Sequence, residues 1–330
     1  RVTTPRPPGS NFKPFLYGAA LENGYSAASV INDAPITRGS YRPNNYENNF
    51  LGPITLRYAL KESRNVPAVR LYDLIGSAKV LEFASKFGFQ TQNFPTNDLT
   101  VALGSQDVQP LELVTGYSSI ANGGFKVNPW FIEKVTSELD GVLYQSDPSV
   151  ICENCDATDS TTKVAPRIMD QRVAYILNSM LESVITEGSG NRVYRDLGRD
   201  ALRGKTGTTN GPQELWFSGF NKNIATTVFV GLDQPEPLGE REQGATVAVP
   251  IWIDFMREAL KDEPETTMSR PDGIVDLLID QNSGSPATPG DPNAVFEYFR
   301  SENAPPLLPE AMPGVEIEEK MNTISTETIF

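Results

Sequence analysis

The chain of 330 residues contains no histidine. A hydroxyl nucleophile in this protein therefore cannot use imidazole as its base, and a Ser-His-Asp triad is excluded. The sequence also argues against structural zinc, because such a site needs about four Cys or His ligands and only Cys152 and Cys155 are present. We expect these cysteines to close a small loop, as a disulfide if the compartment is oxidising. We expect no metal and no cofactor.

Positive charge is scarce, and long apolar runs are missing. Lys and Arg number 28 against 42 Asp and Glu, which gives a formal net charge of −14. This balance disfavours nucleic acid as a partner, since nucleic-acid binding needs a basic surface. No apolar run approaches the roughly 18–20 residues of a membrane-spanning helix, and no signal peptide opens the chain. The start at Arg1, close to the candidate nucleophile, indicates a truncation.

Three short motifs follow one another along the chain: Ser10-Asn11-Phe12-Lys13, Ser63-Arg64-Asn65 and Lys205-Thr206-Gly207-Thr208. With histidine absent, lysine is the candidate base for an activated serine. Positions i and i+3 share one face of a helix, so the side chains of Ser10 and Lys13 can meet. Lysine must lose its proton to act as a base, and burial together with a second cation lowers its pKa. Lys205 is the candidate for that cation.

The first two motifs supply chemical groups that acyl transfer needs. Ser10 at a helix N-terminus places backbone N–H groups where an oxyanion would form, and the third motif can supply the other half of that hole. Ser63 and Asn65 can relay a proton and bind an amide.

The third motif is suited to a substrate that carries a carboxylate. Gly207 lets the substrate approach the backbone closely, and the hydroxyls of Thr206 and Thr208 can bind a carboxylate. Lys205 adds positive charge. The three motifs together predict attack on an amide that lies beside a free carboxylate.

Two further segments match the first two motifs: Ser160-Thr161-Thr162-Lys163 and Ser189-Gly190-Asn191. The first lies in a polar stretch without an apolar helical face, and the second lies in a glycine-rich turn, so we treat both as decoys. Taken singly, Ser10 is explained as a helix cap, Ser63 as a loop serine and Lys205 as the end of a surface strand. The fixed order of three motifs argues against all three explanations holding at once.

Hydrophobic periodicity predicts the elements that carry the motifs. Helices are expected at 12–22, 56–62, 66–75, 77–87, 110–121, 167–185 and 247–260. Strands are expected at 201–208, 215–220 and 225–232, the last two as an antiparallel hairpin. This order predicts a mixed α/β (α+β) fold with helices around an antiparallel sheet. We expect one domain over 1–261 and a Pro/Gly-rich acidic C-terminal extension over 262–330.

The motifs and their neighbours resemble the transpeptidase region of class A penicillin-binding proteins of Gram-negative bacteria. The resemblance covers roughly residues 1–260, and Pro271-Asp272-Gly273-Ile274-Val275 is similar to the family's C-terminal extension. The segments that carry it are Pro8-Gly9-Ser10-Asn11-Phe12-Lys13-Pro14-Phe15, Ile31-Asn32-Asp33-Ala34-Pro35-Ile36, Leu56-Arg57-Tyr58-Ala59-Leu60, Ser63-Arg64-Asn65-Val66-Pro67-Ala68-Val69, Leu103-Gly104-Ser105, Ala121-Asn122-Gly123-Gly124, Lys205-Thr206-Gly207-Thr208-Thr209-Asn210 and Trp216-Phe217-Ser218-Gly219-Phe220.

The resemblance implies a penicillin-binding/β-lactamase-like fold and a D,D-transpeptidase. In that family's reaction, Ser10 attacks the penultimate carbonyl of a stem peptide ending in D-alanyl-D-alanine. An amine of a neighbouring stem captures the acyl-enzyme and cross-links peptidoglycan, and β-lactams trap Ser10 covalently. The other roles carried over by motif are Lys13 as base, Ser63 as proton relay, Asn65 as amide contact, Lys205, Thr206, Gly207 and Thr208 as substrate-binding residues, and the amides of Ser10 and Thr208 as oxyanion hole.

Full-length members of the family have a membrane anchor and a glycosyltransferase domain, and act at the periplasmic face of the inner membrane. They also have sheet strands ahead of the active-site helix, so the resemblance predicts an incomplete five-stranded sheet with an exposed edge. Three alternatives stay open: a serine β-lactamase, a D,D-carboxypeptidase and a non-catalytic penicillin-recognising sensor. No residue in the sequence stands out as the extra glutamate base of a class A β-lactamase.

Overall fold

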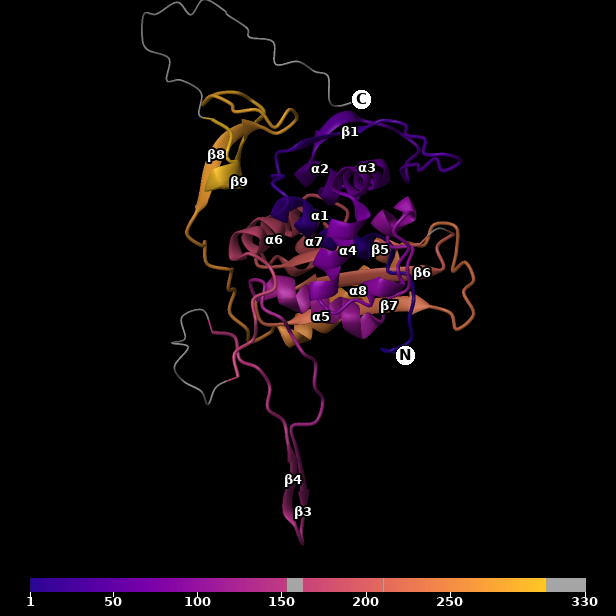
Figure 1. Ribbon diagram of the computed structural model, residues 1–330, viewed down its shortest axis with the longest axis vertical. Coiled ribbons are helices and arrows are strands. Elements are labelled where there is room, and N and C mark those ends of the chain that lie inside the picture. The colour runs from indigo at the N-terminus through magenta and orange to yellow at the C-terminus, as the bar shows by residue number, and fades with distance from the viewer. Residues whose placement is uncertain (153–162, 210, 307–330) are drawn as a thin grey trace, which may run out of the picture.

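The computed structural model describes residues 1–152, 163–209 and 211–306. Helices surround a three-stranded antiparallel sheet, as the sequence predicts (Figure 1). The α-helices are α1 (Lys13–Glu22), α2 (Leu56–Lys61), α3 (Asn65–Ile75), α4 (Ser77–Lys86), α5 (Pro110–Ala121), α6 (Gln171–Thr186), α7 (Arg192–Leu197) and α8 (Val249–Ala259). The strands are β1 (Val30–Asp33), β2 (Gly52–Thr55), β3 (Lys134–Ser137), β4 (Gly141–Gln145), β5 (Arg203–Thr208), β6 (Glu214–Phe220), β7 (Ala225–Gly231), β8 (Ile274–Asp280) and β9 (Ala294–Arg300).

The middle strand of the sheet, β6, is buried along its whole length and pairs antiparallel with β5 and β7. Its side chains alternate between two apolar clusters. Trp216 and Phe220 pack in the larger cluster, which includes α1, α5 and α6, and Phe217 packs with α7 and α8 on the other side. A strand covered on both faces needs apolar residues at successive positions, which explains its aromatic-rich sequence.

Helix α1 runs through the larger cluster and is buried on every side from Lys13 to Leu21. A helix surrounded by protein is apolar all round rather than along one stripe. Phe15 packs edge-on against Phe89 and Tyr117. Gly18 leaves room for the ring of Phe83, which a Cβ at this position would approach to 2.8 Å. This packing fixes the helix at whose start the first motif lies.

Most predicted helices are confirmed, and their capping residues explain the boundaries. The side chain of Thr55 accepts a hydrogen bond from the Tyr58 amide at the start of α2, and Gly76 ends α3 with φ at +88°. The predicted start of α6 at residue 167 is wrong, because Asp170 caps the helix and Arg167 pairs with Phe125 instead. The closing helix starts as a π-helical turn, Gly244–Ala248, and continues as α8.

Three two-stranded ribbons were not predicted. Strands β1 and β2 form one beside α3, and β3 and β4 form an exposed arm that projects from the body of the protein (Figure 1). Strands β8 and β9 form the third, within the segment expected to be a C-terminal extension. This last ribbon packs beside α6 and forms an ion pair between Arg57 and Glu297. The division into 1–261 and 262–330 stays a prediction.

The edge of the sheet at β7 carries no further strand among the described residues, and its seven residues are all partly exposed. Cys152 takes part in a disulfide, whereas Cys155, its expected partner, lies outside the described residues. None of the described helices has both the length and the apolar character needed to cross a bilayer.

Candidate active site

Ser10 lies in a 3₁₀ turn, Gly9–Phe12, that leads directly into α1. The turn is held from two sides. The Gly9 amide donates to the carbonyl of Gly104 over 3.1 Å, and a Cβ on Gly9 would lie 2.8 Å from the carbonyl oxygen of Thr208. Gly9 also has φ at +55°, a conformation that disfavours any side chain. The backbone before Ser10 is therefore confined between strand β5 and Gly104, which ends the 3₁₀ helix Leu99–Leu103.

An open cleft of about 220 Å³ lies over Ser10. One wall comes from β5 and the segment after it, and the opposite wall comes from the loop before β2 and the second motif. The residues lining it are Ser10, Tyr46, Glu47, Glu62, Ser63, Asn65, Ser189, Thr206, Thr208, Thr209, Gly211, Pro212, Glu240, Glu242 and Gln243. A second hollow of about 280 Å³ also reaches Ser10, on the side of Thr100 and Ser105.

Lys13 is fully buried, and within the described residues the hydrogen-bond partners of its amine all lie in the second motif. The Nζ atom lies 2.6 Å from the Ser63 carbonyl oxygen, 2.8 Å from Asn65 Oδ1 and 3.2 Å from the Arg64 carbonyl oxygen. Burial lowers the pKa of Lys13 well below its usual value, and the positive charge of Lys205 lowers it further. A neutral amine can donate its two N–H bonds to the two nearest acceptors and keep its lone pair for a proton.

Lys205 is also fully buried and lies on the other side of the same serine. Its Nζ atom donates to Ser63 Oγ over 2.7 Å and to the Thr206 carbonyl over 3.2 Å. Burial lowers the pKa of Lys205 to about 7, against the opposing effect of Glu62. Lys13 Nζ approaches Ser63 Oγ to 3.4 Å, so this one hydroxyl connects both amines.

The structure brings almost all of the predicted site residues together. Those that line the cleft or bond to one another are Ser10, Lys13, Ser63, Asn65, Lys205, Thr206 and Thr208. The predicted contact between Ser10 Oγ and Lys13 Nζ is not formed as a hydrogen bond, because the amine bonds to the second motif instead. The Ser10 hydroxyl has no hydrogen-bond partner among the described residues. Such bonds are often long before substrate binds.

We expected Gly207 to make room for substrate, but the space beside it is filled by the turn of Ser10. A Cβ at this position would overlap Asn11 Nδ2 and would lie 2.6 Å from the Pro8 carbonyl oxygen. Glycine is therefore required where β5 packs against the turn of Ser10. Thr206 and Thr208 alternate with Gly207 along the strand, and both line the cleft.

The backbone of Thr208 faces the turn of Ser10. The Thr209 amide bonds to the Glu214 carbonyl across the β5–β6 pair. Because successive residues of an antiparallel strand direct their amides to opposite sides, the amide of Thr208 points away from β6. This is the side on which Gly9 and Ser10 lie, so the two amides predicted as an oxyanion hole belong to adjoining backbone segments.

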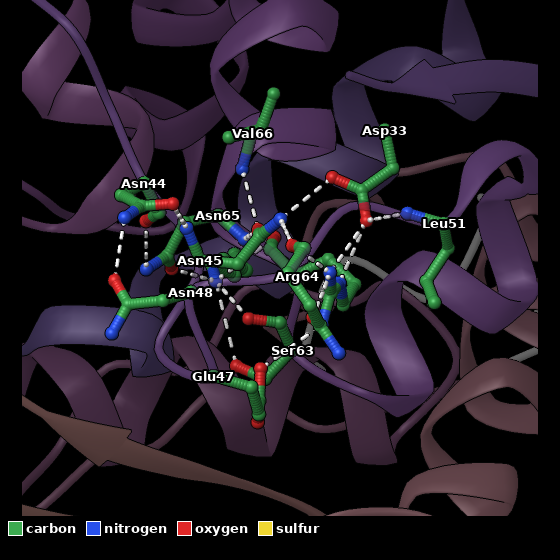
Figure 2. A network of polar contacts seen from close by, with 12 residues as sticks. Asp33, Asn44, Asn45, Glu47, Asn48, Leu51, Ser63, Arg64, Asn65 and Val66 are labelled. Carbon is green, nitrogen blue, oxygen red and sulfur yellow. Dashed lines mark hydrogen bonds and ion pairs between the residues drawn. The ribbon is translucent and has the colours of Figure 1, made fainter. Parts of the chain in front are cut away.

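Sequence reasoning missed two parts of the site. Ser189, treated as a decoy, lines the cleft and lies 3.1 Å from the Thr206 hydroxyl, because its amide bonds to the Lys61 carbonyl at the end of α2. The other decoy, Ser160, lies outside the described residues. Asp33 and Asn45, both buried, were also missed as site residues, although they belong to a polar network around the second motif (Figure 2).

The fold is the penicillin-binding fold. Residues 1–257 match the family model described as the penicillin binding protein transpeptidase domain, and the chain belongs to this family. Penicillin-binding protein 1A of Pseudomonas aeruginosa is 44% identical over 354 residues, which cover 95% of this chain and 43% of that protein. Penicillin-binding protein 1A of Neisseria lactamica is 39% identical, covering 82% of this chain and 33% of that protein.

Solved structures agree with this assignment. The crystal structure of penicillin-binding protein 1A from Haemophilus influenzae matches with a TM-score of 0.86 and 32% identity, covering 92% of this chain and 49% of that one. The PonA1 protein of Mycobacterium tuberculosis in complex with penicillin V shares the fold, with a TM-score of 0.69 and 22% identity over 88% of this chain and 77% of that one. The chain spans less than half the length of the curated relatives named above.

Proposed function

We propose that this chain is a serine D,D-transpeptidase that forms an acyl-enzyme at Ser10 and that β-lactams inactivate it covalently. The observation that carries the proposal is the position of the Ser63 hydroxyl. It lies within hydrogen-bonding distance of two buried lysines, beside the cleft that the half-buried Ser10 lines. A lysine kept neutral by burial and by a neighbouring cation can serve as a base without histidine.

In the acylation half-reaction, Lys13 takes the proton from Ser10 Oγ as this oxygen attacks the penultimate carbonyl carbon of a stem peptide. The amides of Ser10 and Thr208 stabilise the negative charge that develops on the carbonyl oxygen. The C–N bond to the last D-alanine then breaks, and the proton held by Lys13 passes through the Ser63 hydroxyl to the leaving nitrogen, which leaves Lys13 neutral again. Lys205 and the threonine hydroxyls beside it bind the terminal carboxylate.

In the second half-reaction an amine of a neighbouring stem attacks the ester carbonyl. The amine gives up a proton through Lys13, a new amide bond forms, and Ser10 regains its hydrogen. Asn65 contacts the peptide amide of the donor. The partners are thus peptidoglycan stem peptides and, as inhibitors, β-lactams. We place the reaction at the periplasmic face of the bacterial inner membrane, in a longer protein with a membrane anchor and a glycosyltransferase domain.

The test is release of D-alanine from a peptide that ends in D-alanyl-D-alanine, with and without an added acceptor amine. We expect release and a cross-linked product with the wild type, neither with Ser10→Ala, and both with Ser85→Ala, which changes an exposed serine on α4. Release without any cross-linked product would favour the D,D-carboxypeptidase. Fast catalytic hydrolysis of penicillin would favour the β-lactamase, and binding of penicillin without covalent bond formation would favour the sensor.

A further inference from the structure

The first residue of the second motif, Ser63, has a left-handed backbone conformation that residues other than glycine disfavour. Two described residues other than glycine have a positive φ, Ser63 at 57° and Asn48 at 54°. Both lie in the same polar network (Figure 2). A residue with a Cβ adopts this conformation only where its surroundings hold it there, and such positions cluster at functional sites. The groups that hold Ser63 in place are therefore of functional interest.

Arg64, the next residue, is almost fully buried and connects three separate parts of the chain. Its guanidinium donates to Asp33 Oδ2 over 2.9 Å, to Glu47 Oε2 over 2.9 Å and to the Asn49 carbonyl over 2.7 Å. Asp33 is fully buried at the end of β1 and also accepts from the Asn45 side chain over 2.7 Å. The guanidinium of arginine presents its donors in a rigid planar fork that reaches these acceptors at once, whereas lysine carries its donors on one nitrogen at the end of a flexible chain.

Asn45 fixes the other end of the motif. Its Oδ1 accepts hydrogen bonds from the amides of Asn65 over 2.9 Å and Val66 over 3.1 Å, the first two residues of α3. The residue before the helix, Arg64, provides no side-chain cap of its own. Asn45 therefore caps α3 from a distant loop, and it is itself held by Asp33 (Figure 2).

This network determines where the amine of Lys13 finds its partners. Its acceptors are the carbonyls of Ser63 and Arg64 and the side chains of Ser63 and Asn65, all within the second motif. A change in the conformation of Ser63 would move these groups relative to Lys13 and to Lys205, which bonds to the same hydroxyl.

We propose that Arg64, held by Asp33, Glu47 and Asn49, is a positioning residue that fixes the Ser63 turn around the Lys13 amine for acyl transfer. This inference rests on the proposed function, in which Lys13 is the base and Ser63 the relay.

The positive charge of Arg64 predicts the direction in which the pH dependence of acylation shifts when this residue is replaced. The charged groups that act on Lys13 are Lys205 on β5, Glu47 in the loop before β2, and Arg64 itself. Burial and Lys205 lower the pKa of Lys13, Glu47 raises it, and Arg64 lowers it. Acylation needs the neutral amine of Lys13, so its rate rises with pH through the pKa of this lysine. Removing the charge of Arg64 raises that pKa and moves the rise of the rate to higher pH. Removing the charge of Glu47 moves it to lower pH.

Three variants separate position from charge when the rate of acylation by a fluorescent penicillin is measured against pH. Arg64→Lys keeps the charge but loses the fork, so we expect acylation slowed on the order of 10²-fold with an unchanged pH midpoint. Arg64→Met loses both, so we expect similar slowing and a midpoint at higher pH. For Glu47→Gln we expect a midpoint at lower pH. The side chain of Glu47 is about half exposed, so this variant is expected to fold.

Arg57→Met is the matched control, because Arg57 also forms a largely buried ion pair but its partners lie on α6 and β9. We expect it to lower the thermal unfolding temperature without moving the pH midpoint. The positioning role is refuted if Arg64→Lys acylates at the wild-type rate, and the effect of the charges on Lys13 is refuted if Arg64→Met and Glu47→Gln both keep the wild-type midpoint. Either result leaves the proposed function standing as long as wild type is labelled and Ser10→Ala is not. Absence of label on the wild type would refute the proposed function itself.

Discussion

At the scale of single residues, Ser63 combines a strained backbone with a hydroxyl that two lysines approach. Its φ of 57° suits glycine, whereas its Oγ is 2.7 Å from Lys205 Nζ. Chemistry and stability therefore make opposite demands on this position.

Comparison of Ser63→Gly with Ser63→Ala separates these demands. Both variants lose the relay hydroxyl, so we expect acylation to slow on the order of 10²-fold in each. Only glycine relieves the backbone strain, and we expect Ser63→Gly to be more stable than Ser63→Ala by about 1 kcal/mol in urea unfolding. Equal stability of the two variants would mean that the turn stores no strain.

Lys205 gives a prediction about stability and pH. Its pKa is about 7 in the folded protein, against about 10.4 in an unfolded chain. Between these values the unfolded chain holds a proton that the folded protein lacks. The contribution of this lysine to the free energy of unfolding is therefore least favourable below pH 7 and improves as the pH rises towards 10.

We therefore expect the stability of Lys205→Met relative to wild type to fall as the pH is raised from 7 to about 10, measured by urea unfolding at several pH values. Lys222→Met, which changes an exposed lysine, should run parallel to wild type. A difference between Lys205→Met and wild type that does not depend on pH would show that Lys205 is not held with a lowered pKa.

At the scale of elements, the turn that carries Ser10 is in close backbone contact with Gly104, which ends the 3₁₀ helix Leu99–Leu103. Gly104 has φ at +70°, and a Cβ there would overlap the carbonyl oxygen of Gly9. Gly39 has a similar φ of +60°, but a Cβ at this position would have no atom within 4 Å. A side chain at either glycine would be disfavoured by the positive φ, but only at Gly104 would it also collide with another segment.

We expect Gly39→Ala to cost about 1 kcal/mol of stability, for the backbone conformation alone, and to acylate normally. Gly104→Ala should cost roughly 1–3 kcal/mol more and slow acylation, because Gly9 must move and carries Ser10 with it. Urea unfolding and penicillin labelling of both variants provide the test. Equal effects of the two substitutions would mean that the contact with Gly9 does not constrain the turn.

The sequence predicted those helices and strands whose hydrophobic periodicity is visible within a single segment. Helix α5 was predicted with its observed bounds, and the hairpin of β6 and β7 was predicted from two aromatic and β-branched runs. Strands β1 and β2 have only four residues each and pair across a long loop, and β2 contains Pro53. Such short partners carry too little periodicity to be recognised. The network of Asp33, Asn45 and Arg64 depends on their pairing and was missed with them.

At the scale of the whole molecule, the ribbon of β8 and β9 contacts the domain through a buried ion pair, a hydrogen bond from Arg300 to the Leu21 carbonyl and a ring contact between Tyr298 and Tyr175. Arg57 on α2 lies 2.5 Å from Glu297 Oε1 and also donates to the Ser179 carbonyl on α6. Glu297 is 2% exposed. The aliphatic residues of β8 were a signal for this strand, but the acidic, Pro- and Gly-rich sequence around it favoured an irregular extension.

We expect Glu297→Gln to lower the free energy of unfolding by about 1–3 kcal/mol, because the charge of Arg57 loses its buried partner. Acylation should be unchanged, since the pair lies away from the cleft. Asp254→Asn, at the exposed pair with Arg257, should change stability by less than about 0.5 kcal/mol. A slower acylation in Glu297→Gln would instead connect the ribbon to the active site.

The central claim is that Ser10 is the nucleophile of a covalent penicillin-binding site, and intact-mass measurement after incubation with a fluorescent penicillin tests it most directly. We predict one stoichiometric, slowly released adduct on the wild type, located on Ser10 by peptide mapping, and no adduct on Ser10→Ala. A folded wild-type chain that gains no mass, or an adduct that persists in Ser10→Ala, would contradict the account.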